Sequence, residues 1–147
     1  MLKTLPLDSC VDEIALSGRW VRGLEGSLST SWASSSLSFV FSGTTLEILP
    51  GALTERKDRW NGGTPMVAIW LGKDENSIAS HQPPWKACDV EAGTGMTLVH
   101  TMTMAKTCVR IMMIDWASVF ELGAILVDEV LPFMTPLTSS SIADTAI

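Results

Sequence analysis

The stretch of sequence that decides the fold reads LSFVFSGTTLEI and spans residues 37–48. It alternates, with Leu37, Phe39 and Phe41 on one face of an extended chain and two serines on the other. A Gly-Thr-Thr triplet interrupts the alternation, which then resumes and ends at Pro50. The pattern predicts two short strands separated by a turn, with the phenylalanines between two sheets.

The remaining apolar segments are also short and are divided by Gly, Pro, Asn and Ser. Residues 66–71 are apolar on both faces, as expected of a central strand that is covered on both sides. Residues 119–131 also suit a short helix, but Gly123 would interrupt it, so we assign most of this segment to a strand. Further strands are predicted at 93–105 and 108–116.

Strands at this spacing predict an all-β fold, a two-sheet antiparallel β-sandwich of jelly-roll type. We assign residues 12–133 to the sandwich, residues 1–11 to an N-terminal arm, and residues 134–147 to a C-terminal tail or the start of a linker. No spacing of strand, helix and strand occurs that would predict a nucleotide-binding α/β fold.

Composition excludes some partners. The chain has 147 residues, 46% of them hydrophobic, with a formal net charge of −6. That acidic balance disfavours nucleic acid, and the apolar runs are far shorter than the ~20 residues of a membrane span. Residues 1–8 lack the apolar stretch of a secretory signal, which indicates either a cytosolic chain or one that has lost its leader. The sequence therefore predicts no particular cellular compartment.

Motifs for hydrolysis are missing. No Gly-x-Ser-x-Gly elbow and no Gly-Asp-Ser occur. His100 falls among methionines in a predicted strand, where we expect a core or half-buried side chain, and His81 falls in a polar loop. The sequence therefore predicts no catalytic residue, although a Ser–His–Asp arrangement without a motif is an alternative.

Metal-binding patterns are missing as well, and no cofactor is predicted. Asp74-Glu75-Asn76 resembles part of a Ca²⁺ loop but is more typical of a solvated hairpin tip. Cys10, Cys88 and Cys108 are widely spaced, which favours buried free thiols; one disulfide with one free thiol is the alternative.

Tryptophan is the unusual feature of the composition, since the chain has six and no tyrosine. Four of them fall on or beside predicted strands and are expected to pack in the core or at a sheet edge. These are Trp20, Trp32, Trp70 and Trp116.

The other two tryptophans fall in polar loops. Trp60 lies between Arg59 and Asn61, and Trp85 follows two prolines. An exposed indole beside such side chains suits a sugar, because its flat face covers apolar C–H groups while its neighbours bond the hydroxyls. We therefore predict a sugar site at Trp60, Trp85, Asn61 and Arg59. The alternative is that these rings fold back over the end of the sandwich.

Several segments together resemble the N-terminal β-sandwich domain of carbohydrate esterase family two and related SGNH-type acetylxylan esterases. The opening Gly18-Arg19-Trp20 is similar to the first strand of that domain, and a tryptophan and serines before the Phe-x-Phe-x-Gly-Thr turn are similar to its second and third strands. The resemblance covers residues 12–133, in the segments 14–20, 32–43, 44–48, 99–103, 110–116 and 120–124.

In that family the sandwich precedes a hydrolase domain that begins with Gly-Asp-Ser, a motif this sequence lacks. The resemblance thus implies a non-catalytic carbohydrate-associated module, either alone or as a fragment of a carbohydrate deacetylase. The second hypothesis is a structural or protein-interaction module, such as a homo-oligomer that buries the apolar faces of residues 66–71. We also expect Arg19 to pair with Asp115 or Glu121 at a sheet edge.

Overall fold

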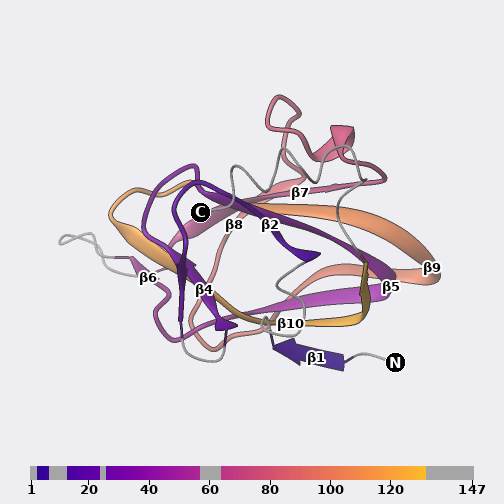
Figure 1. Cartoon of the computed structure of the whole chain (residues 1–147), viewed down its shortest axis with the longest axis horizontal. Helices are drawn as coiled ribbons and strands as arrows, with labels where there is room; N and C mark the ends of the chain where they lie inside the picture. Colours follow the sequence, from indigo (N-terminus) through magenta and orange to yellow (C-terminus); the bar gives the residue numbers. More distant parts are fainter. Residues whose placement is uncertain (1–2, 7–12, 24–25, 57–63, 132–147) are drawn as a thin grey trace.

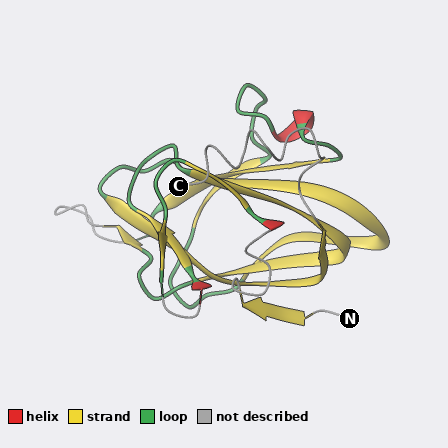
Figure 2. Cartoon of the chain, viewed as in Figure 1, coloured by secondary structure: helices red, strands yellow, loops and turns green. Residues whose placement is uncertain are grey.

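The computed structural model describes residues 3–6, 13–23, 26–56 and 64–131, with side chains for residues 13–23, 26–56 and 64–127 (Figure 1). The predicted C-terminal tail lies outside these ranges. Almost all regular structure in them is β-strand (Figure 2). The strands are β1 (Lys3–Pro6), β2 (Ala15–Ser17), β3 (Val21–Arg22), β4 (Leu28–Thr30), β5 (Ser36–Pro50), β6 (Glu55–Arg56), β7 (Met66–Gly72), β8 (Lys86–Asp89), β9 (Met96–Met113) and β10 (Ser118–Leu131), and the short 3₁₀ helix η4 (Asn76–Ile78) lies between β7 and β8.

Every pairing between described strands is antiparallel, and the main order is β3-β4-β10-β5-β9-β7-β8. The long strands β5 and β9 run through both layers of a sandwich and bend between them at the right of Figure 1. Beyond the bend β5 pairs with β10, while its first half pairs with β2. The predicted all-β antiparallel sandwich is therefore confirmed.

The bend arises where β5 and β9 lose register. Gly43 pairs with Ala105 and Thr45 pairs with His100, so residues 101–104 of β9 stand opposite Thr44 alone. Gly43 has a φ of 153°, which a side chain would disfavour. Such bulges increase the local twist and let one strand serve two layers.

This bulge corrects two expectations. Residues 37–42 and 46–48 are not separate strands but parts of β5, and residues 93–105 and 108–116 merge largely into β9. The expectation that His100 is a core or half-buried side chain is also wrong. His100 is exposed, as is Met102 at 94%, because their part of β9 projects from the edge of the sandwich.

The main core lies between the layers. Phe39 and Phe41 are fully buried, as predicted, against apolar side chains from β7, β9 and β10. Residues 119–131, assigned mostly to a strand from the sequence, form most of β10, and β10 supplies Phe120 and Leu122 to this core.

A second, smaller core covers the outer face of β7. Ala68 and Trp70 pack there with Ile78 of η4, and the Trp70 indole N–H donates to the carbonyl of Gln82 at 2.8 Å. The prediction that residues 66–71 are covered on both sides is confirmed. The loop of the same chain provides the cover, so this face offers no surface for a partner; a homo-oligomer through another surface stays a prediction.

Residues 3–6, assigned above to an N-terminal arm, form β1 and pair with residues 124–127 of β10. They therefore extend the layer that contains β10 and β4.

Candidate functional site

The sugar site predicted from the sequence is only partly within the described residues. Arg59, Trp60 and Asn61 lie outside them, and of that set Trp85 alone has a described position. Its indole is 51% exposed at the start of β8, an edge strand, where its backbone N–H donates to the carbonyl of Ile69 at 2.7 Å. The Lys86 ammonium lies 5.6 Å from the centre of the ring. Trp85 thus presents an indole and a cation to solvent.

The four tryptophans expected in the core or at a sheet edge divide into two pairs. Trp20 and Trp70 are buried, as predicted. For Trp32, 54% exposed, and Trp116, 82% exposed, the prediction of packing in the core or at a sheet edge is wrong, because both lie between strands. These two lie on the chain segments that cross between the layers, where no sheet covers a side chain.

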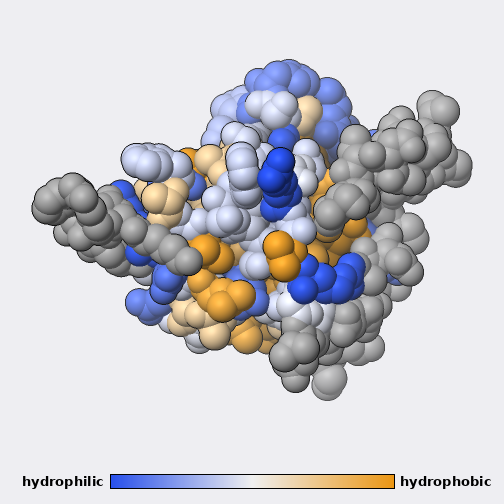
Figure 3. Space-filling model, turned by 60° about the vertical axis from the view of Figure 1, so that its left-hand side comes forward, coloured by the Kyte–Doolittle hydropathy of each residue, from blue (hydrophilic) through white to orange (hydrophobic). Residues whose placement is uncertain are grey.

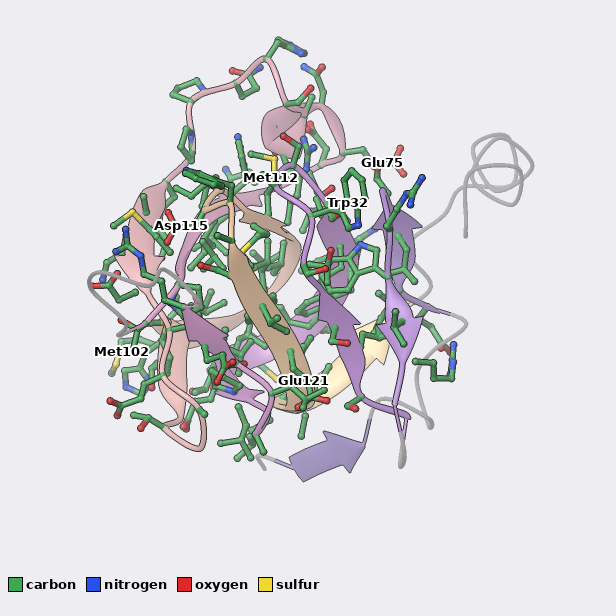
Figure 4. The ribbon with its side chains drawn as sticks, turned by 90° about the vertical axis from the view of Figure 1, so that its left-hand side faces the viewer. Trp32, Glu75, Met102, Met112, Asp115 and Glu121 are labelled. Atoms are coloured by element: carbon green, nitrogen blue, oxygen red, sulfur yellow. The ribbon has the colours of Figure 1, made fainter. Side chains whose placement is uncertain are left out.

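The two crossing segments run side by side at one end of the sandwich. The backbone N–H of Ser34 donates to the carbonyl of Met113 at 2.7 Å, and Thr30 pairs with Phe120. The β4–β5 crossing, which carries Trp32, therefore borders the β9–β10 crossing, which carries Trp116. Figure 4 views this end of the molecule, with Trp32 and Asp115 on opposite sides of it.

A tight turn fixes the backbone of Trp32. Its carbonyl accepts from the N–H of Ser35 at 3.2 Å, and its own N–H donates to Thr30 Oγ1 at 3.1 Å. Ser34 has a φ of 75° within this turn. Because both sides of Trp32 are hydrogen-bonded, its indole is presented from a defined position.

The Gly18-Arg19-Trp20 segment approaches the same turn. Gly18 has a φ of 92°, and a Cβ at this position would lie 2.8 Å from the Cα of Ser35. The buried Trp20 indole N–H donates to the carbonyls of Ser17 and Ser36 at 3.0 and 3.1 Å. These contacts hold the segment against the start of β5, next to which the Arg19 side chain is exposed.

Arg19 stacks on Trp32. The guanidinium carbon lies 4.4 Å from the centre of the indole, and the Arg19 N–H donates to Ser35 Oγ at 3.0 Å. A cation at this distance from an aromatic face is attracted by the ring quadrupole. The stack orders both side chains although each is exposed.

Beside the stack lies a groove of about 380 Å³, which we call the Trp32 groove. Its volume falls within the range of small-ligand sites, roughly 300–1,000 Å³. Its surface is mainly apolar, with hydroxyl groups from β4 and the following turn. Figure 3, turned toward this end, shows apolar and hydrophilic side chains interspersed. The groove is lined by Arg19, Val21, Ser29, Thr30, Ser31, Trp32 and Val119.

Arg19 does not pair with either acid that the sequence offered. Asp115 Oδ2 accepts from the backbone N–H of Met66 at 2.9 Å. Glu121 is buried and accepts from Ser27 Oγ at 2.8 Å and from the N–H of Leu53 at 3.1 Å. The expected ion pair is therefore wrong, since both carboxylates hold the backbone or a loop in place.

The remaining candidates for chemistry are also placed. Among the described residues, His100 contacts the hydroxyl of Thr45 at 3.2 Å and no carboxylate orients its ring. His81 lies in an exposed loop, as predicted. Asp74 Oδ1 accepts from the N–H of Ser77 at 2.9 Å, which confirms a turn there. Within the same part of the chain, no group of three or more His, Cys, Asp or Glu side chains is arranged to hold a metal ion.

Cys88 and Cys108 are free thiols, half-buried and buried, in agreement with the sequence, while Cys10 lies outside the described residues. Burial raises the pKa of both thiols, so both stay protonated near neutral pH. No helix in the described part of the chain has the length and apolar character to cross a bilayer.

No protein-family model and no curated protein sequence matches the chain. Solved structures match its fold. A family two carbohydrate esterase from Cellvibrio japonicus has a TM-score of 0.68 and 18% identity over 92% of this chain and 37% of the esterase.

Two single modules match over nearly their whole length. The CBM36-1 domain of a multidomain xylanase from the hindgut metagenome of Trinervitermes trinervoides gives a TM-score of 0.54 at 9% identity, over 86% of this chain and 96% of that domain. The low affinity xylan binding module CBM86 from Roseburia intestinalis gives 0.52 at 7% identity, over 89% and 96%.

Sequence reasoning missed the Trp32 groove. The signal was present in the Gly-Arg-Trp motif and in the serines around Trp32, but only the packing of Gly18 against Ser35 brings them together. The chain spans about a third of the length of the esterases it matches. Its resemblance to family two carbohydrate esterases is confirmed at the level of the fold, which it shares with part of those enzymes and with whole modules such as CBM86.

Proposed function

We propose that this chain is a non-catalytic carbohydrate-binding module and that a sugar ring lies on Trp32 in the Trp32 groove. The observation that carries the proposal is a half-exposed indole, fixed by a hydrogen-bonded turn and an Arg19 stack, at the wall of a groove of about 380 Å³. The fold shared with a xylan binding module supports the same class of ligand.

A sugar has two kinds of surface, and the groove has partners for both. A pyranose ring has apolar C–H faces, which gain free energy when an indole removes them from water. Its hydroxyls need hydrogen-bond partners at the rim, and Ser29 and Ser31 line the groove beside Trp32. The stack with Arg19 reduces the side-chain entropy that binding would otherwise have to remove.

The site at Trp85, together with Trp60, Asn61 and Arg59, stays a second proposed sugar contact. Trp85 directly precedes edge strand β8, whereas Trp32 lies where the chain passes from β4 to β5. One chain that carries two such contacts would bind long glycans more tightly than short ones.

We expect Trp32→Ala to weaken binding of xylo-oligosaccharides and cello-oligosaccharides at least tenfold, since a buried aromatic contact contributes about 1.4 kcal/mol or more. Isothermal titration calorimetry measures the effect, with Trp85→Ala as the matched variant of equal chemistry. If Trp85→Ala lost binding and Trp32→Ala bound as tightly as the unaltered chain, the sugar site would be at Trp85 and not at Trp32. No heat with either glycan for the unaltered chain would refute the function.

We also propose that the module accompanies a hydrolase domain, as the sandwich does in the family that the sequence resembles. The chain spans only about a third of the esterases that share its fold. We expect the genomic reading frame to continue beyond Ile147 into a strand that ends in Gly-Asp-Ser, and sequencing of the transcript checks this. A stop codon directly after Ile147 would contradict it.

A further inference from the structure

Arg19 has a charge that no described carboxylate neutralises. Its backbone N–H is bonded to Ser35, and its guanidinium faces the Trp32 ring. Within the described ranges no carboxylate lies at ion-pair distance from it, and Asp115 and Glu121 are engaged by other groups. Relative to the described carboxylates, the Arg19 guanidinium in the groove is therefore available to a ligand.

The stack leaves the hydrogen-bonding edge of Arg19 available. A guanidinium that lies over an indole uses its flat face, while its five N–H groups point outward in its own plane. Such a fork matches the two oxygens of a carboxylate and binds them through two parallel hydrogen bonds. Trp32 therefore orients the Arg19 guanidinium and leaves its N–H donors available for hydrogen bonds.

The other residues that line the groove indicate which class of molecule would carry that carboxylate. Val21, which is 66% exposed, and Val119 supply apolar walls, and Ser29 and Ser31 supply hydroxyls. A sugar has the matching combination of C–H faces and hydroxyls. The chain as a whole carries a net charge of −6, so attraction of an anion here depends on the local guanidinium and not on the general field of the protein.

We infer that the Trp32 groove selects a sugar unit that carries a carboxylate, a uronic acid, over a neutral one. This rests on the proposed carbohydrate-binding function. The carboxylate of the uronic acid accepts two hydrogen bonds from Arg19, and the ring of the same unit lies beside Trp32. An acidic branch on a neutral backbone glycan would satisfy both contacts.

The test compares a neutral xylo-oligosaccharide with the same oligosaccharide bearing one glucuronic acid branch, by calorimetry at low salt. We expect the unaltered chain to bind the acidic ligand about tenfold more tightly, because a charge-assisted bidentate contact contributes about 1.5–3 kcal/mol before desolvation. The preference should decrease as the ionic strength is raised, since the site is exposed.

Arg19→Gln should remove the preference, so that the two oligosaccharides bind equally, and it should weaken both because the stack on Trp32 is lost. Arg19→Lys should keep part of the preference. The matched control is Lys86→Gln, which removes the other cation beside an exposed indole and should leave the preference unchanged. Unfolding midpoints within a degree or two of the unaltered chain establish that each variant is folded.

Equal affinity for the two oligosaccharides, or a preference that survives Arg19→Gln, would overturn the inference and leave the proposed function intact. Loss of the preference in Lys86→Gln would assign it to the Trp85 surface instead and also overturn it. Absence of binding by both ligands would refute the proposed function and the inference with it.

Discussion

Replacing Trp20 by alanine should lower the free energy of unfolding by about 3–5 kcal/mol, the range for removal of a large buried aromatic side chain. The Trp20 ring is 5% exposed and meets Phe120 edge to face, with centroids 6.4 Å apart and planes at 78°. Its N–H also donates to two backbone carbonyls, from Ser17 and Ser36. The substitution therefore removes core volume and the hydrogen bonds that hold two segments together.

Urea unfolding followed by far-ultraviolet circular dichroism measures this loss independently of tryptophan fluorescence. Trp85→Ala is the control, because a half-exposed side chain outside the core should change the free energy of unfolding by no more than about 0.5 kcal/mol. Trp20→Phe should fall between the two, since it keeps most of the ring and loses the N–H. Equal effects of Trp20→Ala and Trp85→Ala would contradict the structure of this core.

Replacing Gly18 by alanine should destabilise the chain by about 1–3 kcal/mol and weaken oligosaccharide binding. Gly18 has a φ of 92°, and an added Cβ would lie 2.8 Å from the Cα of Ser35, which is backbone and cannot rotate away. The segment would have to shift, and the shift would displace Arg19 from Trp32. The effect on binding would thus come from positioning and not from a lost ligand contact.

Gly93→Ala is a close control for this variant. Gly93 also has a positive φ, of 77°, but an added Cβ meets nothing within 4 Å. Gly93→Ala should therefore lower the free energy of unfolding only by the cost of a positive φ for a residue with a Cβ, about 1–2 kcal/mol, and should leave oligosaccharide binding unchanged. Thermal unfolding and calorimetry on both variants separate the two contributions. If Gly93→Ala weakened binding as much as Gly18→Ala, the assigned role of Gly18 would be wrong.

The fold was predictable because it depends on local patterns. The alternation around Phe39 and Phe41 marks which side chains face a core, and the two apolar faces of residues 66–71 mark a strand covered twice. The bulge opposite Thr44 was not predictable in this way. The apolar alternation in the sequence of β9 continues through residues 100–104 without a break. The bulge nevertheless exposes His100 and Met102 there.

The candidate site was likewise predictable only in part. The sequence marked Trp85 by its polar loop, and it also marked the Gly-Arg-Trp motif that resembles the esterases. It gave no reason to separate Trp32 from Trp20, since both stand beside predicted strands.

By itself the sequence determined the class of fold and the core faces around Phe39, Phe41 and residues 66–71, because these follow from the period of apolar residues along the chain. Only the tertiary structure decided which tryptophans reach solvent and which cation lies beside them. Exposure at the end of a sandwich depends on how crossing segments pack, and the contact of Gly18 with Ser35, which places Arg19 over Trp32, joins residues that no local pattern connects.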